Sequence, residues 1–233
     1  YPRKATVRGQ EHPVARVKIV DMRVDHVVYA AEQDGARATA ERLAGTLGVE
    51  PVDGGVHPRF GTRNVILPLA DERYVEVVEV LDHPASDKAP FGQVVRARSE
   101  AGGGWLGWVI EVDDMAAQEA RLGREAVQGN RHRPDGVELR WRQLGVKGLQ
   151  ADPQLPFFIK WEPDSPHPST QVSEDVVLAS LMIAGDPSRV RDWIGLKEGE
   201  KVSPSIGLNF VAPHGTPGLL AVSFRTSQGE VTI

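Results

Sequence analysis

An internal repeat constrains the fold of this 233-residue chain more than any other feature of its sequence. Residues 23–80 hold an alternating apolar stretch, an alanine-rich stretch, and three further alternating stretches. Alternation with a period of two predicts a β-strand, and apolar residues three and four apart predict an amphipathic helix. The predicted order is therefore strand, helix, strand, strand, strand. Residues 105–162 repeat this order with altered residues, and residues 177–233 repeat it in a shorter form. A period of about 80 residues is too long for a solenoid and indicates duplication of a module.

Glycines mark the ends of the predicted helices and strands. Apolar spacing predicts a helix within residues 34–47, and a glycine directly after a helix supplies its stop. Each of the three predicted helices has such a glycine: Gly48, Gly123 and Gly195. The pair Gly54 and Gly55 predicts a turn between the helix and the next strands.

The strands of the first module carry one aliphatic face and one polar face. The aliphatic face suits packing under the helix, because successive side chains of a strand point to opposite sides. The polar face carries His26, Asn64, Tyr74 and Glu76. Such a set indicates either a solvated sheet face or the lining of a pocket, and the pattern alone favours the solvated face.

Composition excludes several classes of function. The formal charge of −5 and the lack of a Lys/Arg cluster predict no nucleic-acid partner. The chain has no cysteine, which excludes disulfides and thiolate sites. No apolar run approaches the roughly 18–20 residues of a membrane span, so no membrane association is expected. A cytoplasmic, cofactor-light protein is the resulting expectation.

The sequence predicts four segments. Residues 1–21 precede Met22, which stands directly before the first strong strand, so they are interpreted as an N-terminal extension that is vector-derived or upstream of the native start. Residues 22–162 form the paired modules. Residues 163–176 are rich in Pro and Ser and predict a linker. Residues 177–233 form a third, partial module.

The repeated stretches resemble a known family. The segments DHVVYA, HPRFGTRNVILPL, YVEVVEV, GGGWLGWVIEVDD, GVELRWRQ and LPFFIKWE are similar to the glyoxalase-like branch of the vicinal oxygen chelate superfamily, which includes bleomycin-resistance proteins and extradiol dioxygenases. The resemblance covers residues 23–162, and residues 182–233 resemble a degenerate third module. It implies an α+β fold in which two βαβββ modules curl a mixed sheet around a cup, with a third degenerate βαβββ module beside them.

The resemblance also implies a site at the bottom of the cup. Family members hold a divalent metal with His and Glu from the first and fourth strands of each module, and His26 and Glu76 occupy these positions in the first module. Imidazole and carboxylate suit Zn, Fe, Mn, Ni or Mg. Aligning the modules places Trp108 opposite His26 and Lys160 opposite Glu76, and neither is a ligand for a cation. The implied metal site is therefore incomplete, and a metal is either weakly held or absent.

Other side chains are candidates for substrate binding, each with a structural alternative. Lys160 forms an ion pair with Glu76 that orients an anionic substrate, or it faces solvent. Trp108 walls an apolar cavity, or it belongs to the core. Arg140 clamps a substrate carboxylate, or it lies on a solvated face. His57 replaces a missing ligand, or it is exposed in a turn. Asn64 and Tyr74 complete the predicted polar face.

Two functions follow from the resemblance. The first is a lyase, isomerase or dioxygenase acting on a small metabolite, with Glu76 as base or ligand and His26 as its partner. The second is a metal-free protein that binds or sequesters a small molecule in the same cup. A third reading is a scaffold whose last module forms an oligomer interface, such as a homodimer.

Overall fold

The computed structural model describes residues 22–169 and 175–233. The predicted N-terminal extension, residues 1–21, and part of the predicted linker lie outside the described residues. The first module comprises β1 (Met22–Ala30), α1 (Ala36–Leu47), β2 (Val52–His57), β3 (Thr62–Leu69) and β4 (Arg73–Val80). The second comprises β5 (Gly104–Val112), α4 (Met115–Leu122), β6 (Val127–His132), β7 (Glu138–Leu144) and β8 (Phe157–Trp161). The third comprises β9 (Val177–Ala184), α6 (Pro187–Ile194), β10 (Gly207–Val211), β11 (Gly218–Thr226) and β12 (Gly229–Thr232).

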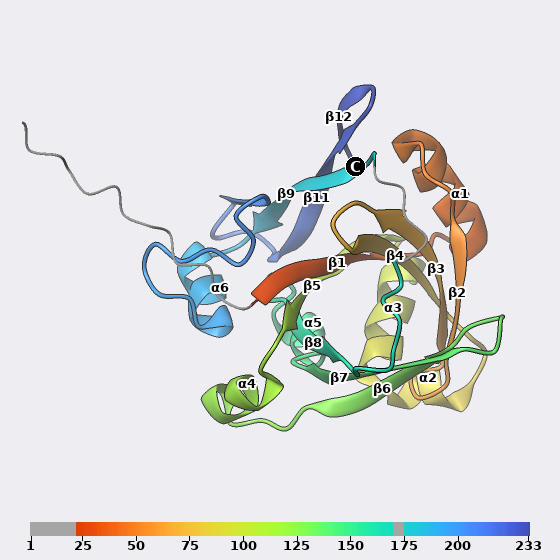
Figure 1. Ribbon diagram of the computed structural model, residues 1–233, viewed down its shortest axis with the longest axis horizontal. Helices are drawn as coiled ribbons and strands as arrows, with labels where there is room; N and C mark the ends of the chain where they lie inside the picture. Colours follow the sequence, from red (N-terminus) through yellow and green to blue (C-terminus); the bar gives the residue numbers. More distant parts are fainter. Residues whose placement is uncertain (1–21, 170–174) are drawn as a thin grey trace, which may run out of the picture.

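Eight strands of the first two modules close into a barrel, in the order β1-β4-β3-β2-β6-β7-β8-β5 (Figure 1). In each of these two modules the first strand pairs in parallel with the last, β1 with β4 and β5 with β8. The predicted α+β fold with two modules curled around a cup is thus confirmed. The stop glycines are confirmed as well, because Gly48, Gly123 and Gly195 all adopt the left-handed conformation directly after their helices.

The two modules meet along two seams. β1 pairs antiparallel with β5 over most of its length, whereas β2 and β6 pair at Val56 and His132. The predicted turn at Gly54 and Gly55 is wrong, because both residues lie inside β2 at this second seam. A Cβ on Gly55 would come 1.9 Å from the backbone oxygen of His132. Glycine is therefore needed here for the close approach of two strands.

The two faces of the barrel strands have different neighbours. The aliphatic face of the first module packs under α1, in a cluster with Ala40, Leu43 and Leu47. Residues 84–100, for which the sequence predicted no element, form α2 (Pro84–Lys88) and α3 (Pro90–Glu100). Apolar side chains of α3 pack with inward residues of the barrel, so α3 covers that interior. A short helix, α5 (Gly148–Ala151), precedes β8.

The third segment has the predicted order of elements but pairs its strands differently. Its sheet runs β10-β9-β11-β12, with β9 between a parallel and an antiparallel neighbour. Side chains of this sheet, including Leu181, Val222 and Phe224, share one core with the outer face of β5. Of the helices in the described segments, none is long and apolar enough to cross a membrane.

Candidate functional site

The polar face of the first module points into the barrel and lines a cavity. Of the two readings of this face, the solvated one, which the pattern alone favoured, is wrong, because His26 is 3% exposed and Glu76 is 6% exposed. The free volume is about 30 Å³, which is room for about two waters. Six strands and two other segments contribute the lining residues: His26, His57, Phe60, Tyr74, Glu76, Phe91, Arg131, Trp141, Gln143, Phe157, Ile159 and Trp161. A larger groove of about 730 Å³ shares Phe60, Phe91 and Gln143 with the cavity and therefore adjoins it.

Glu76 stands at the centre of the polar cluster. Asn64 donates a hydrogen bond from Nδ2 to Glu76 Oε1 at 2.7 Å. The Nε2 atoms of His26 and His57 lie 3.8 and 3.7 Å from the two oxygens of the Glu76 carboxylate. Gly54 makes room for this arrangement, since a Cβ there would come 2.0 Å from Asn64 Oδ1. The first module alone thus gathers two imidazoles around one carboxylate.

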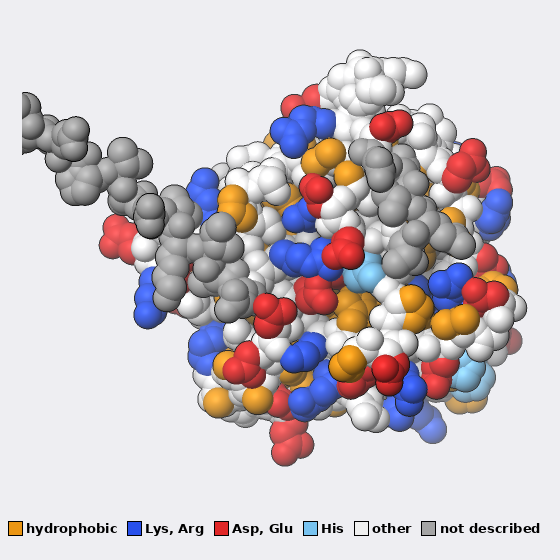
Figure 2. All heavy atoms as spheres, viewed as in Figure 1, with side chains coloured by type: hydrophobic (Ala, Val, Ile, Leu, Met, Phe, Trp, Pro, Cys, Tyr) orange, Lys and Arg blue, Asp and Glu red, His pale blue; other side chains and the backbone are white. Residues whose placement is uncertain are grey.

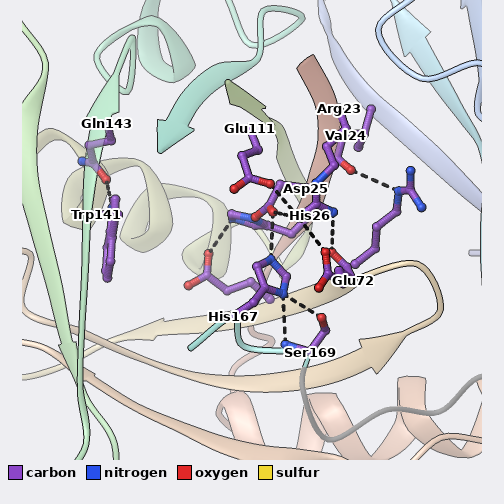
Figure 3. A network of polar contacts seen from close by, with 12 residues as sticks. Arg23, Val24, Asp25, His26, Glu72, Glu111, Trp141, Gln143, His167 and Ser169 are labelled. Atoms are coloured by element: carbon purple, nitrogen blue, oxygen red, sulfur yellow. Dashed lines mark hydrogen bonds and ion pairs between the residues drawn. The ribbon is translucent and has the colours of Figure 1, made fainter. Parts of the chain in front are cut away.

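Asp25 links His26 to a residue far along the chain. Asp25 Oδ2 lies 2.7 Å from His26 Nδ1, and Asp25 Oδ1 lies 2.9 Å from His167 Nε2 (Figure 3). His167 belongs to the segment that follows β8, and its ring also meets the edges of Tyr74 and Trp161. Strand alternation would point Asp25 away from His26, but the register of β1 shifts between Val24 and His26. This β-bulge turns Asp25 towards the site.

The charge states of the buried groups follow from their partners. Burial by itself raises the pKa of Asp25, but hydrogen bonds from His167 and His26 outweigh it and hold that pKa well below its usual value. Burial lowers the pKa of His57 well below its usual value, and the nearby Arg131 adds to this effect. Burial raises the pKa of Tyr74 well above 10. At neutral pH the site therefore holds an ionised Asp25, a neutral His57 and a protonated Tyr74.

The second module contributes a cation and aromatic rings. Arg131 lies on β6, is 3% exposed and lines the cavity. Trp141 donates a hydrogen bond from Nε1 to Gln143 Oε1 at 2.8 Å, on the neighbouring strand β7. Trp141 and Trp161 contact each other with ring centroids 5.4 Å apart. The two halves of the barrel are thus chemically different, with titratable groups on one side and rings plus a guanidinium on the other.

Three predicted site residues, Trp108, Lys160 and Arg140, point away from this cavity. For Trp108 the alignment of the two modules was wrong by one residue. His26 pairs with Val109, and Trp108 pairs with Val27 instead. A shift of one residue moves a side chain to the opposite face of a strand. Trp108 is therefore fully buried in the outer core, where Nε1 donates to the backbone oxygen of Gln154 at 3.0 Å.

Lys160 was misaligned by one residue in the opposite direction, because Ile159 and not Lys160 corresponds to Glu76. In β8 the residues Phe157, Ile159 and Trp161 point inward, so Lys160 points outward and donates to the backbone oxygen of Asp113. The predicted ion pair between Lys160 and Glu76 is not formed.

Arg140 also lies outside the barrel. Its side chain is 62% exposed and lies 3.8 Å from Glu138 of the same strand. The inward residues of β7 are Trp141 and Gln143, which alternate with the outward Arg140 and Arg142. The predicted carboxylate clamp at Arg140 is therefore misplaced.

The donor set does not fit a divalent cation. The closest approach to a ligand set is His26, His57 and Glu76, but no group of three or more His, Cys, Asp or Glu in residues 22–169 and 175–233 is arranged to hold a metal. With the corrected register, the strand positions opposite His26 and Glu76 hold Val109 and Ile159, which carry no donor atom. Arg131 adds a positive charge to the same cavity, and it repels a cation.

Sequence reasoning missed Asp25, Arg131 and His167. Asp25 directly precedes His26, so alternation assigned it to the other face. Arg131 lies near the end of β6, and no pattern in the sequence assigned it to the interior. Alternation places Arg131 and Gly129 on one face of β6, but only the structure shows that this face is the inner one. His167 lies in the predicted linker, and no sequence pattern connects it to Asp25.

Comparison with known proteins identifies the family. A family model described as a glyoxalase-like domain matches residues 24–195. The chain belongs to this glyoxalase-like family. The match confirms the resemblance to the glyoxalase-like branch of the vicinal oxygen chelate superfamily that was drawn from the sequence. No curated protein matches the chain.

One solved structure shares the fold of this glyoxalase-like protein, and others are similar to parts of it. A hypothetical protein from Staphylococcus aureus has a TM-score of 0.65 and 16% identity, over 89% of this chain and 92% of that chain. Methylmalonyl-CoA epimerase from Mycobacterium tuberculosis has a TM-score of 0.42 and 16% identity, over 66% of this chain and 97% of that chain. At 16% identity, the first similarity supports the fold and not a reaction.

We expect the buried His57 to make the stability of this glyoxalase-like protein depend on pH. The pKa of His57 is lowered in the folded state, so only the unfolded chain takes up a proton here as pH falls below about 6.5. The stability contribution is complete above that pH and is lost below it. As pH decreases, the free energy of unfolding should therefore fall more steeply in wild type than in His57→Gln. The difference between the two slopes should be up to about 1.4 kcal/mol per pH unit.

Urea unfolding between pH 7.5 and 5.5 measures this difference. The matched control is His132→Gln, because His132 ends β6 as His57 ends β2 but its side chain is 57% exposed. It should keep the wild-type slope. Equal slopes for all three proteins would show that His57 takes up a proton in the folded state.

Proposed function

We propose that this protein is an enzyme that moves a proton on a small molecule bound in the barrel, with His26 and Glu76 as the acid–base pair. The observation that carries the proposal is the position of His26 Nε2, which faces Glu76 Oε2 at 3.8 Å inside the cavity while Nδ1 is held by the buried Asp25. A proton-transfer site needs two groups that exchange a proton within hydrogen-bond reach of one substrate atom.

Asp25 prepares His26 to act as a base. An ionised carboxylate accepts hydrogen bonds, so it selects the tautomer of His26 with the proton on Nδ1 and leaves Nε2 free to accept a proton. The negative charge of Asp25 also stabilises the imidazolium that forms when Nε2 is protonated. His167 holds the other oxygen of Asp25 and so fixes its orientation.

Glu76 provides the second group. Asn64 binds one oxygen of its carboxylate and leaves the other directed at His26. For this reaction the pair holds one proton between its two members: the member without it removes a proton from the substrate, and the member with it delivers one. Delivery to carbon is the chemistry of isomerases and epimerases, and delivery to a leaving group is that of lyases. Because the donor set does not fit a divalent cation, no step is routed through a metal, and the dioxygenase reaction is not part of this proposal.

The aromatic lining supports a second candidate, binding or sequestration without reaction. Phe60, Phe91, Phe157, Trp141 and Trp161 surround much of the cavity, and such rings hold planar ligands by stacking. In this case His26 and Glu76 bind the polar edge of a ligand and exchange no proton.

Deuterium exchange distinguishes the two candidates without knowledge of the full reaction. Ligands are first found among small carbonyl compounds and carboxylic acids by thermal stabilisation of the protein. Each ligand is then followed by NMR in D₂O for exchange of its carbon-bound protons. Wild type should catalyse exchange of at least one of them, and Glu76→Gln and His26→Gln should each lower the rate about 10²–10⁴-fold.

The control for this experiment is Glu138→Gln, since Glu138 is an exposed acid on β7 outside the barrel, with 42% of its side chain accessible. It should retain the wild-type rate. Ligands that bind wild type without any exchange would support sequestration and contradict the enzyme.

A further inference from the structure

Arg131 is a buried cation that forms no ion pair with any described residue. Within the described parts of the chain its guanidinium forms no ion pair, and its Nε, which is shielded from solvent, has no hydrogen-bond partner. Arginine stays protonated in proteins, so it cannot avoid this situation by losing its charge. An unpaired charge in a protein interior costs several kcal/mol. A folded protein that keeps such a group unpaired is prepared to receive an anion.

The residues around Arg131 indicate that an anion reaches it from the cavity. Arg131 lines the same small space as His26, His57 and Glu76. Figure 2 shows acidic and basic side chains interspersed over the face in view, whereas Arg131 is withdrawn from the surface. Glu76 accepts a hydrogen bond from Asn64, and within the described residues it forms no ion pair with Arg131, although its negative charge favours the charged guanidinium. The neutral His57 adds no competing charge.

We propose that Arg131 binds a carboxylate of the substrate, so that the substrate is a small carboxylic acid. Binding of the carboxylate does not depend on the proposed proton transfer. Only the reaction of the bound acid rests on that proposed function. The planar guanidinium matches a carboxylate with two parallel hydrogen bonds.

The volumes of the cavity and of the adjoining groove favour a substrate whose acidic end is small. The cavity of about 30 Å³ admits a group of the size of about two waters, which suits a carboxylate and the adjoining carbon. The remainder of the molecule then extends past Phe60 and Phe91 into the adjoining groove of about 730 Å³. This places the carbon next to the carboxylate beside His26 and Glu76.

A pair of probes that differ only in charge tests the proposal. Phenylacetate and phenylacetamide have nearly the same shape, but only the first is an anion at pH 7. Titration calorimetry with wild type should give phenylacetate a dissociation constant about 10–100-fold lower, which corresponds to a charge-assisted hydrogen-bonded pair. Inorganic phosphate is included as a bulkier anion and should bind more weakly than phenylacetate.

Variants of two arginines decide the assignment. Arg131→Met should abolish the preference for phenylacetate over phenylacetamide, and Arg131→Lys should restore part of it. Arg140→Met is the matched control, because Arg140 is an exposed arginine on the adjacent strand, and it should keep the full preference. The melting temperature of Arg131→Met should not fall, since an unpaired buried charge has been removed.

Three results would overturn the proposal: no binding of phenylacetate to wild type, equal binding of acid and amide, or a full acid preference in Arg131→Met. A large loss of thermal stability in Arg131→Met would also overturn it, because Arg131 would then be a structural residue. The readout is binding and not turnover. A preference for the acid without any proton exchange would therefore contradict the proposed enzyme, whereas the assignment of Arg131 as the carboxylate-binding residue would stand.

Discussion

Replacing Asp25 with asparagine is expected to lower the free energy of unfolding by about 3–5 kcal/mol at pH 7. Asp25 is fully buried and holds two histidines, His26 at 2.7 Å and His167 at 2.9 Å. An asparagine offers one acceptor oxygen in place of two, and its NH₂ group meets a ring nitrogen that is also a donor. At least one histidine is then buried without its partner, which carries a large penalty.

Urea unfolding of wild type and Asp25→Asn measures this loss. The pKa of Asp25 is lowered in the folded state, so its stabilising effect is complete above the unfolded pKa of about 3.9 and is lost as pH falls below it. The difference between the two proteins should therefore narrow below about pH 4. Glu111→Gln is the control, because Glu111 shares Arg23 with Asp25 but forms no hydrogen bond with either histidine. It should change stability by less than about 1 kcal/mol.

Trp108→Ala is the second substitution with a large expected effect, a loss of about 3–5 kcal/mol. Trp108 is fully buried in the core between β5 and the four-stranded sheet of the third module. Its removal leaves a cavity there and leaves the backbone oxygen of Gln154 without its donor. Calorimetric or urea unfolding measures the loss.

Trp161→Ala is the control for this prediction. Trp161 is only partly buried and lines the barrel cavity, and its Nε1 has no hydrogen-bond partner among the described residues. Trp161→Ala should lower the free energy of unfolding less than Trp108→Ala does. Of the two variants, only Trp161→Ala should weaken the binding of aromatic ligands. The opposite pattern would indicate that Trp108 lines the ligand cavity, as the sequence alignment of the two modules predicted.

Much of the fold was predictable because its signals are local. Alternating residues such as Val65, Leu67 and Leu69 and the helix-ending Gly48 specify their elements without reference to the rest of the chain. The same alternation placed His26, Tyr74 and Glu76 on one face. It could not show whether that face meets solvent or a second half-barrel, because burial depends on which segments pack together.

Errors in the site arose where the strands depart from strict alternation. β5 changes register against β1 between Gly107 and Trp105, and this irregularity exchanges the faces of Trp108 and Val109 relative to a simple alignment. The bulge at Asp25 is held by contacts from elsewhere: Val24 N donates to Ser203 Oγ at 2.9 Å, and Arg73 Nε donates to Val24 O at 3.1 Å. These partners lie 179 and 49 residues away along the chain.

The sequence by itself determined the order of strands and helices, the duplication, and the polar residues that the first module turns to one side. Only the tertiary structure decided that this side is enclosed, that Asp25 and His167 join it, and that the second module supplies Arg131 instead of a second set of ligands. The physical reason is that periodicity depends on neighbouring residues, whereas burial, bulges and charge pairing depend on segments brought together by folding.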